Sequence, residues 1–191
     1  MKIELKETIS DETKIEYIDF CRNVQNQIID AYKTFFYLKA VEEKHLIKRE
    51  MPWSEQAYVE FLIRCFQERL VLSVNKLAID SGSEKYCVKN LRSFIKRELA
   101  SSFDEHGLVL SINSNKKMEE QIKDYRDKFI AHNLRGSREI SLYMSQMKSL
   151  LDEVKVYYNK LLLDELLPGK MVVTDIDISG LERFCKMGLR I

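Results

Sequence analysis

Residues 15–36 read IEYIDFCRNVQNQIIDAYKTFF, and this stretch decides the fold. Its apolar residues recur every three or four positions, as Ile15, Ile18, Cys21, Val24, Ile28, Tyr32 and Phe35. This spacing places them on one side of an α-helix. We therefore expect a helix over about 11–48 whose apolar side faces a core.

The same repeat continues through most of the chain. It predicts further helices over about 54–80, 84–100, 116–132 and 139–166. Pro52 separates the first helix from the second, for which Ser54 is the expected N-cap, and the neighbouring Trp53 is expected to plug the end of the bundle.

The remaining segments are short. We expect a loop over 101–115 with an extended piece at 108–112, weak strand-like alternation at 172–178 and a helical piece at 181–187. The predicted fold class is all-α: an up-and-down helical bundle of about five helices with a small C-terminal appendage. Its domain is assigned to residues 1–166, with residues 167–191 as the appendage packed on the same domain.

The composition limits the possible classes of protein. The chain has 191 residues, 45% of them hydrophobic and 32% charged, which fits one globular domain. Only 6 Gly and 2 Pro are present, which argues against β-sandwiches and barrels and leaves no Gly-rich phosphate loop. The net charge of +1 argues against holding nucleic acid by bulk charge alone, although a local basic surface remains possible.

The cysteines and histidines form no metal-binding pattern. Cys21, Cys65, Cys87 and Cys185 include no C-x-x-C pair, and the 3 His residues supply no matching cluster, so we expect no metal and no other cofactor. The chain starts without the apolar stretch of a signal peptide, and no run approaches membrane-spanning length. A reduced, cytoplasmic setting without a membrane partner is therefore expected.

Residues 125–133, YRDKFIAHN, bring together the groups that RNA cleavage needs. His132 has a side chain that titrates near neutrality and can move the proton of a 2′-hydroxyl or protonate the leaving oxygen. Arg126 can offset the charge that builds on the phosphorus oxygens, and Asp127 can orient either partner. Because the nucleophile is the 2′-hydroxyl, such an enzyme needs no metal and leaves 2′,3′-cyclic phosphate ends.

Helical geometry leaves two arrangements open for this site. Arg126 and His132 are six positions apart, so in a regular helix they lie roughly 120° apart around the axis. Only Lys128 and His132 are direct neighbours, at i and i+4. Either the helix frays near Ala131, or the groups converge across the axis of a symmetric dimer.

A purely structural interpretation also fits this segment. A His near a helix C-terminus, followed by Asn133, is a common capping arrangement that is favourable to the helix dipole. Arg126, Asp127 and Lys128 would then form an ordinary solvated face.

The motif of residues 126–132, RDKFIAH, resembles the signature of the HEPN superfamily, in which an Arg and a polar residue precede a His by four to six intervening positions. The Arg-Asp-Lys-x-x-Ala-His form is similar to the abortive-infection branch, and residues 69–80, RLVLSVNKLAID, resemble the second-helix region of that superfamily. The resemblance covers roughly residues 11–166.

This resemblance implies an all-α bundle that forms a homodimer through the motif helix and cleaves RNA without a metal. It implies Arg126 and His132 as the catalytic pair, with Asp127 as the polar auxiliary. The chain would then be the toxin or effector of a phage-defence (abortive-infection) or toxin–antitoxin system, with an antitoxin protein as a possible partner. Leu134 stands where toxins paired with a nucleotidyltransferase antitoxin carry a Tyr, so the resemblance does not extend to that regulation.

A row of basic residues gives the candidate RNA surface. These residues are Lys85, Lys89, Arg92 and Lys96, spaced by three and four along one predicted helix, with Lys128 of the motif as a further contact. A solvated helix face is the alternative interpretation of the row. For the whole protein, the alternative to a ribonuclease is a non-catalytic HEPN interaction or regulatory module.

Overall fold

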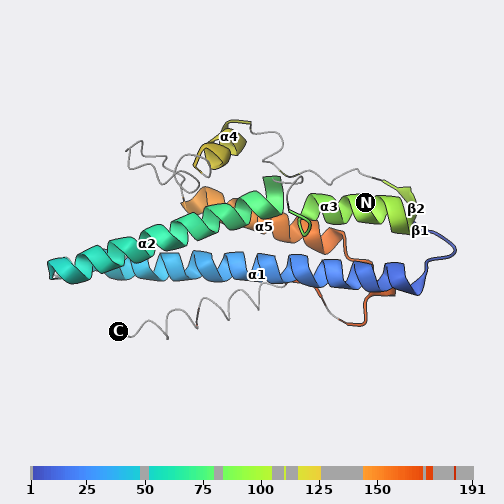
Figure 1. Ribbon diagram of the computed structural model, residues 1–191, viewed down its shortest axis with the longest axis horizontal. Coiled ribbons are helices and arrows are strands. Elements are labelled where there is room, and N and C mark those ends of the chain that lie inside the picture. Colours follow the sequence, from blue (N-terminus) through green and yellow to red (C-terminus); the bar gives the residue numbers. More distant parts are fainter. Residues whose placement is uncertain are drawn as a thin grey trace.

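The computed structural model of the chain describes residues 2–47, 52–79, 84–104, 110, 116–125, 144–169, 171–173 and 183. The described part is mostly helical, with one two-stranded ribbon at one end and one continuous core, as Figure 1 shows. The prediction of an all-α bundle is confirmed. No described helix is long and apolar enough to cross a membrane.

The longest element is helix α1, Asp11–Ile47, which extends for about 55 Å. Ser10 begins it, because its Oγ accepts a hydrogen bond from Thr13 N at 3.2 Å. Cys21, Val24, Ile28, Tyr32 and Phe35 are buried as predicted. The first turns differ from the prediction, because Tyr17 and Phe20 lead the buried side while Ile15 is 60% exposed.

Helix α2, Trp53–Val74, packs along α1 and passes directly into the π-helical turn η1, Asn75–Ile79 (Figure 1). Its N-cap is Pro52 and not Ser54, so the cap lies two residues earlier than predicted. Trp53 does not plug the bundle, because 84% of its surface is exposed. Tyr58 and Phe61 also face outward, whereas Leu70, Val74 and Leu77 are buried as their spacing predicts.

Helix α3, Val88–Phe94, continues into a second π-helical turn, η2, Ile95–Leu99. It starts later than the predicted residue 84, because Cys87 has an extended backbone and caps the helix: its Sγ accepts a hydrogen bond from Asn90 N at 3.4 Å. The predicted apolar face is confirmed, since Val88, Leu91, Ile95 and Leu99 are all buried.

A short antiparallel ribbon closes this end of the molecule. Strand β1, Ile3–Leu5, pairs with strand β2, Ala100–Phe103, with an irregularity between Glu4 and Leu5. Lys6 caps the end of η2, because its N–H donates to Leu99 O at 2.9 Å and its Nζ to Arg97 O at 2.8 Å. The start of the predicted loop over 101–115 is therefore a strand, and it forms because the chain's N-terminal segment supplies its partner. Of the extended piece expected at 108–112, only buried Leu110 is described.

Two further helices complete the described bundle, α4, Lys116–Tyr125, and α5, Met144–Lys160. The rest of the predicted helix over 116–132 and the start of the one over 139–166 lie outside the described residues. α5 ends at Lys160, six residues before the predicted end, and a 3-10 turn, η5, Asp164–Leu166, follows.

Tyr17 holds the chain where α5 ends. Its buried hydroxyl donates to Leu161 O at 3.0 Å and accepts from Leu163 N at 2.8 Å. Both backbone groups would otherwise lack a helical partner, because the i to i−4 ladder has ended. Burial raises the pKa of Tyr17, so the hydroxyl stays neutral.

The first described residues of the C-terminal appendage pack on α1 and α5. Met171 O accepts hydrogen bonds from Gln25 Nε2 at 2.8 Å and from the Tyr158 hydroxyl at 3.3 Å. The Asn159 amide bonds both Val173 N and Val173 O, as a neighbouring strand would. Met171 and Val173 are buried in the same core as the helices.

We expect Tyr17→Phe to lower the free energy of unfolding by about 1–3 kcal/mol, because it leaves a buried carbonyl and a buried N–H without their partner. Urea denaturation measures the loss. Tyr58→Phe is the matched control, since Tyr58 is 61% exposed and its change should cost almost nothing. Equal stability of the two variants would contradict this role of the Tyr17 hydroxyl.

Candidate functional site

The motif that carries the catalytic prediction lies between two described helices. Arg126, Asp127, Lys128 and His132 are outside the described residues, so their geometry is not part of the structure. α4 ends its described course at Tyr125, directly before the motif, and α5 begins at Met144 after it. The described structure therefore gives the helix that leads to the motif and the next described helix after it.

Helix α4, which leads to the motif, is held in place by apolar and charged contacts. This helix packs against η1, and Ile122 is fully buried. One turn earlier, Glu119 accepts a hydrogen bond from Lys123 Nζ at 2.6 Å. That hydrogen bond holds the pKa of Glu119 below its usual range, and the charge of Lys89 on α3 acts in the same direction. Apolar packing thus holds α4 against η1, and the charge of Lys89 on α3 acts on Glu119 of α4.

The turn η1, on which α4 packs, contains an unusual polar group. Asn75 opens this π-helical turn and is only 2% exposed, and no donor in the described part of the chain reaches its Oδ1. Unpaired acceptors are rare in buried positions because burial without a hydrogen bond costs free energy. π-helical turns also occur frequently at functional sites. The turn against which α4 packs therefore carries a buried acceptor that has no partner among the described residues.

Helix α5, the next described helix after the motif, is joined to α1 by a polar triad that the sequence analysis did not predict. Lys148 Nζ lies 2.7 Å and 2.8 Å from the two carboxylate oxygens of Asp152, and the buried Tyr32 hydroxyl donates to Asp152 Oδ1 at 2.5 Å. The Lys148 ammonium also lies 5.6 Å from the centre of the Tyr32 ring. The i, i+4 spacing of Lys148 and Asp152 could have indicated their pairing, but Tyr32 is 120 residues away in sequence.

The predicted basic row does not form one surface. Lys85 precedes α3, and its Nζ lies 5.2 Å from the centre of the Tyr86 ring. Lys89 Nζ donates to Ile79 O at 3.3 Å, on the side of the helix that faces η1. Farther along the row, Arg92 is half-buried and Lys96 is exposed.

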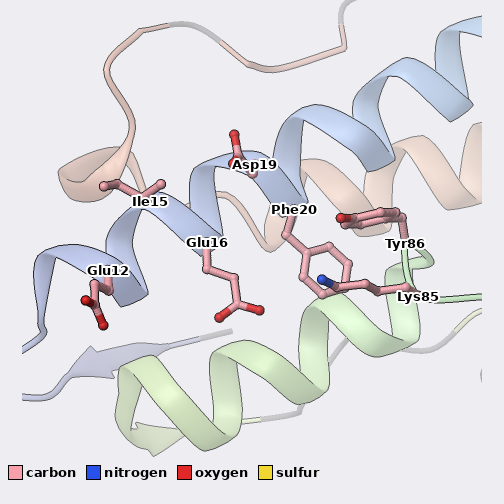
Figure 2. A pocket seen from close by; sticks show the side chains of 7 residues that line it. All are labelled: Glu12, Ile15, Glu16, Asp19, Phe20, Lys85 and Tyr86. Carbon is pink, nitrogen blue, oxygen red and sulfur yellow. The ribbon is translucent and has the colours of Figure 1, made fainter.

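Lys85 belongs to a different surface, a pocket of about 320 Å³. Figure 2 shows Lys85 and Tyr86 beside Phe20, whose ring meets that of Tyr86 edge-on with centroids 5.3 Å apart. The other lining residues come from α1 and are Glu12, Ile15, Glu16 and Asp19. Three carboxylates against one ammonium give this pocket a negative charge, which repels phosphate.

Two of the described cysteines, Cys21 and Cys87, are buried. Burial raises the pKa of the Cys21 thiol to about 12, and burial also raises the pKa of Cys87, which caps α3. Both thiols therefore stay protonated at neutral pH and are poor nucleophiles. Among the described residues, no three His, Cys, Asp or Glu side chains gather as a metal site would require.

Comparison with known proteins gives no match: no family model, no curated protein and no solved structure is similar to the chain.

We expect Asp152→Ala to destabilise the protein by about 1–3 kcal/mol, because it removes the acceptor of the buried Tyr32 hydroxyl. Tyr32→Phe should cost much less in the Asp152→Ala background than in the wild type, and urea denaturation of the four proteins measures this coupling. Asp30→Ala is the control, since its pair with Lys33 at 3.2 Å is exposed and contributes little. Additive losses at Tyr32 and Asp152 would contradict the triad.

Proposed function

We propose that the chain is a HEPN-type, metal-independent endoribonuclease that acts in the cytoplasm. We further propose that it is the toxin or effector of a phage-defence (abortive-infection) or toxin–antitoxin system. The observation that carries this proposal is the sequence from Arg126 to His132, which directly follows a helix of an all-α chain.

The proposed reaction uses three side chains. His132 takes the proton of a 2′-hydroxyl, whose oxygen attacks the adjacent phosphorus as the bond to the 5′-oxygen breaks. The protonated His132 then gives a proton to the leaving 5′-oxygen. Arg126 stabilises the negative charge of the phosphorus oxygens, and Asp127 orients its neighbours. The products are a 2′,3′-cyclic phosphate and a free 5′-hydroxyl.

A homodimer through the motif helix would solve the geometric problem that the spacing of the motif creates. A two-fold axis beside the helix brings two copies of Arg126 and His132 into one cleft. An antitoxin protein that covers this cleft would restrain the enzyme until it is needed.

The described surroundings support a built site at the motif. α4 is anchored by buried Ile122 and by the charges around Glu119, and α5 is anchored by Asp152. A site that positions reacting groups needs such rigid elements on both sides. Asn75 Oδ1, which has no partner among the described residues, adds a buried acceptor on the turn η1 that α4 contacts.

The proposed RNA surface comprises Lys89, Arg92 and Lys96, with Lys128 of the motif. Lys85 is left out, because it lies in the acidic pocket on α1. A phosphate backbone that follows α3 would meet Lys96 at its exposed end and Lys89 at the end nearest α4.

We expect His132→Ala and Arg126→Ala each to abolish RNA cleavage, and growth arrest on expression, without unfolding the protein. Each removes a group required for proton transfer or for stabilising phosphorane charge. Gel analysis of RNA products and circular dichroism measure the two effects. Chelators should leave wild-type cleavage unchanged, and the products should carry 2′,3′-cyclic phosphate ends.

A mixture of the two inactive variants tests the shared cleft. Heterodimers of His132→Ala and Arg126→Ala chains hold one intact His and one intact Arg on different protomers, so some cleavage should return. Wild-type cleavage by either single variant would exclude the catalytic assignment. An inactive wild-type protein that still binds a partner would favour the non-catalytic HEPN module.

We expect Arg92→Gln and Lys96→Gln each to weaken RNA binding and to reduce the slope of log K against log salt concentration by about one. Lys85→Gln is the matched control and should leave the slope unchanged. Binding titrations over a range of salt concentrations measure the slopes. An equal change of the slope in Lys85→Gln would contradict the division of the basic row. An unchanged slope in Arg92→Gln or Lys96→Gln would mean that these residues belong to an ordinary solvated helix face.

A further inference from the structure

The pocket beside Lys85 lies between the first turns of α1 and the segment that leads into α3. Its volume of about 320 Å³ is at the lower end of the range of small-molecule sites, about 300–1,000 Å³. The apolar part of its wall comprises Ile15, Phe20 and Tyr86, and the acidic part comprises Glu12, Glu16 and Asp19. Figure 2 shows Glu12 and Glu16 on the same side of α1, with Lys85 extending past the ring of Phe20. A wall of this composition fits a ligand that has both apolar and positively charged parts.

Two of the three carboxylates have no cation beside them. Asp19 pairs with Arg22 at 3.2 Å, but Glu12 and Glu16 form no ion pair in the described part of the chain. Like charges at positions i and i+4 destabilise a helix. The helix dipole favours a carboxylate in the first turn, which accounts for Glu12 but not for Glu16. A cation bound in the pocket would therefore relieve the repulsion that Glu16 creates.

The aromatic part of the wall already attracts a cation. Lys85 Nζ lies 5.2 Å from the centre of the Tyr86 ring, and Lys85 forms no ion pair with a described residue. The negative face of an aromatic ring attracts an ammonium group in this way. A cationic ligand is thus drawn to the pocket by the ring of Tyr86 and by the carboxylates of α1, while Lys85 repels it.

The spacing of the carboxylates indicates the shape of the ligand. At about 100° per residue, Glu12, Glu16 and Asp19 fall within roughly 60° of the circumference of α1. Along the helix axis they follow each other at about 6 Å and about 4.5 Å. A linear aliphatic polyamine repeats its ammonium groups at similar distances, because short methylene chains separate them. Those methylene chains can contact Ile15, which is 60% exposed, and the ring of Tyr86.

The charge of the whole chain makes this attraction local. The net charge is +1, so the chain as a whole does not attract a polycation. A protein partner is less suited to the pocket than a small molecule, because a specific protein interface buries about 1,200 Å² or more. The negative charge is concentrated on a few side chains around one small pocket.

We propose that this pocket is a binding site for a linear aliphatic polyamine. Glu12 and Glu16 bind ammonium groups of the ligand, and Tyr86 contacts its chain and one of its charges. The site lies outside the motif of residues 126–132 and does not rest on the proposed ribonuclease function.

The first test is calorimetric titration of the whole chain with the triamine spermidine. Glu12→Gln and Glu16→Gln should each weaken binding about threefold, and the double variant about tenfold, because each change removes one exposed ion pair. Lys85→Gln should tighten binding, since it removes the competing ammonium. Glu120→Gln on α4 is the matched control, because it makes the same change at an exposed position outside the pocket and should leave the affinity unchanged.

A second set of titrations tests the ligand class and the aromatic wall. The diamine putrescine should bind more weakly than spermidine, because it reaches fewer carboxylates. Mg²⁺ at the same concentration should not displace spermidine, since it offers no apolar chain to the wall. Tyr86→Leu should weaken binding, whereas Tyr86→Phe keeps the ring and should preserve it.

Four results would overturn the proposal. These are no binding of spermidine at millimolar concentration, equal weakening in Glu120→Gln, displacement of spermidine by equimolar Mg²⁺, and tighter binding of a lysine-rich peptide than of spermidine. The last result would assign the pocket to a basic protein segment. Circular dichroism checks the fold of each variant, and if Tyr86→Leu unfolds, the exposed Glu12→Gln and Glu16→Gln variants still decide the outcome.

Discussion

The burial of one side of α1 is the constraint on which the rest of the structure depends. This helix contacts α2, α3 and α5 as well as both π-helical turns, so each of these elements is placed by its fit to the same surface. The buried residues of α1 that belong to the core run from Tyr17 to Ala40, and they account for a large part of it. A long helix with one apolar side can serve several shorter partners in this way without a central sheet.

Buried tyrosine hydroxyls make long-range polar contacts of the core between α1, α5 and the segments that follow α5. Tyr17 takes over backbone groups where α5 has ended, and Tyr158 binds both Cys21 O and Met171 O. Tyr32 reaches the carboxylate of Asp152 in the middle of α5. Buried hydroxyls are suited to these places because they satisfy backbone or charged groups while their rings fill the core.

The two surfaces that the structure distinguishes on α3 differ in their electrostatics. Lys85 stands before the helix and faces the carboxylates of α1, whereas Lys89 faces η1 and the charge of Glu119 on α4. The division follows from where α3 begins, since the cap at Cys87 turns the residues before it towards Phe20. A regular row in the sequence therefore becomes two environments.

The sequence by itself determined the helical class, the core face of α1 beyond its first turns, and the apolar face of α3, because these follow from the period of the helix. It also supplied the motif from Arg126 to His132, whose chemistry depends on residue type. Only the tertiary structure decided the ribbon of β1 and β2, the exposure of Trp53, and the pairing of Tyr32 with Asp152. Each of these depends on which distant segment lies alongside: β2 needs the N-terminal residues as its partner, and Trp53 is exposed because no described helix reaches it. Local spacing carries no information about such contacts, so periodicity could predict the elements but not how their ends, edges and buried polar groups are satisfied.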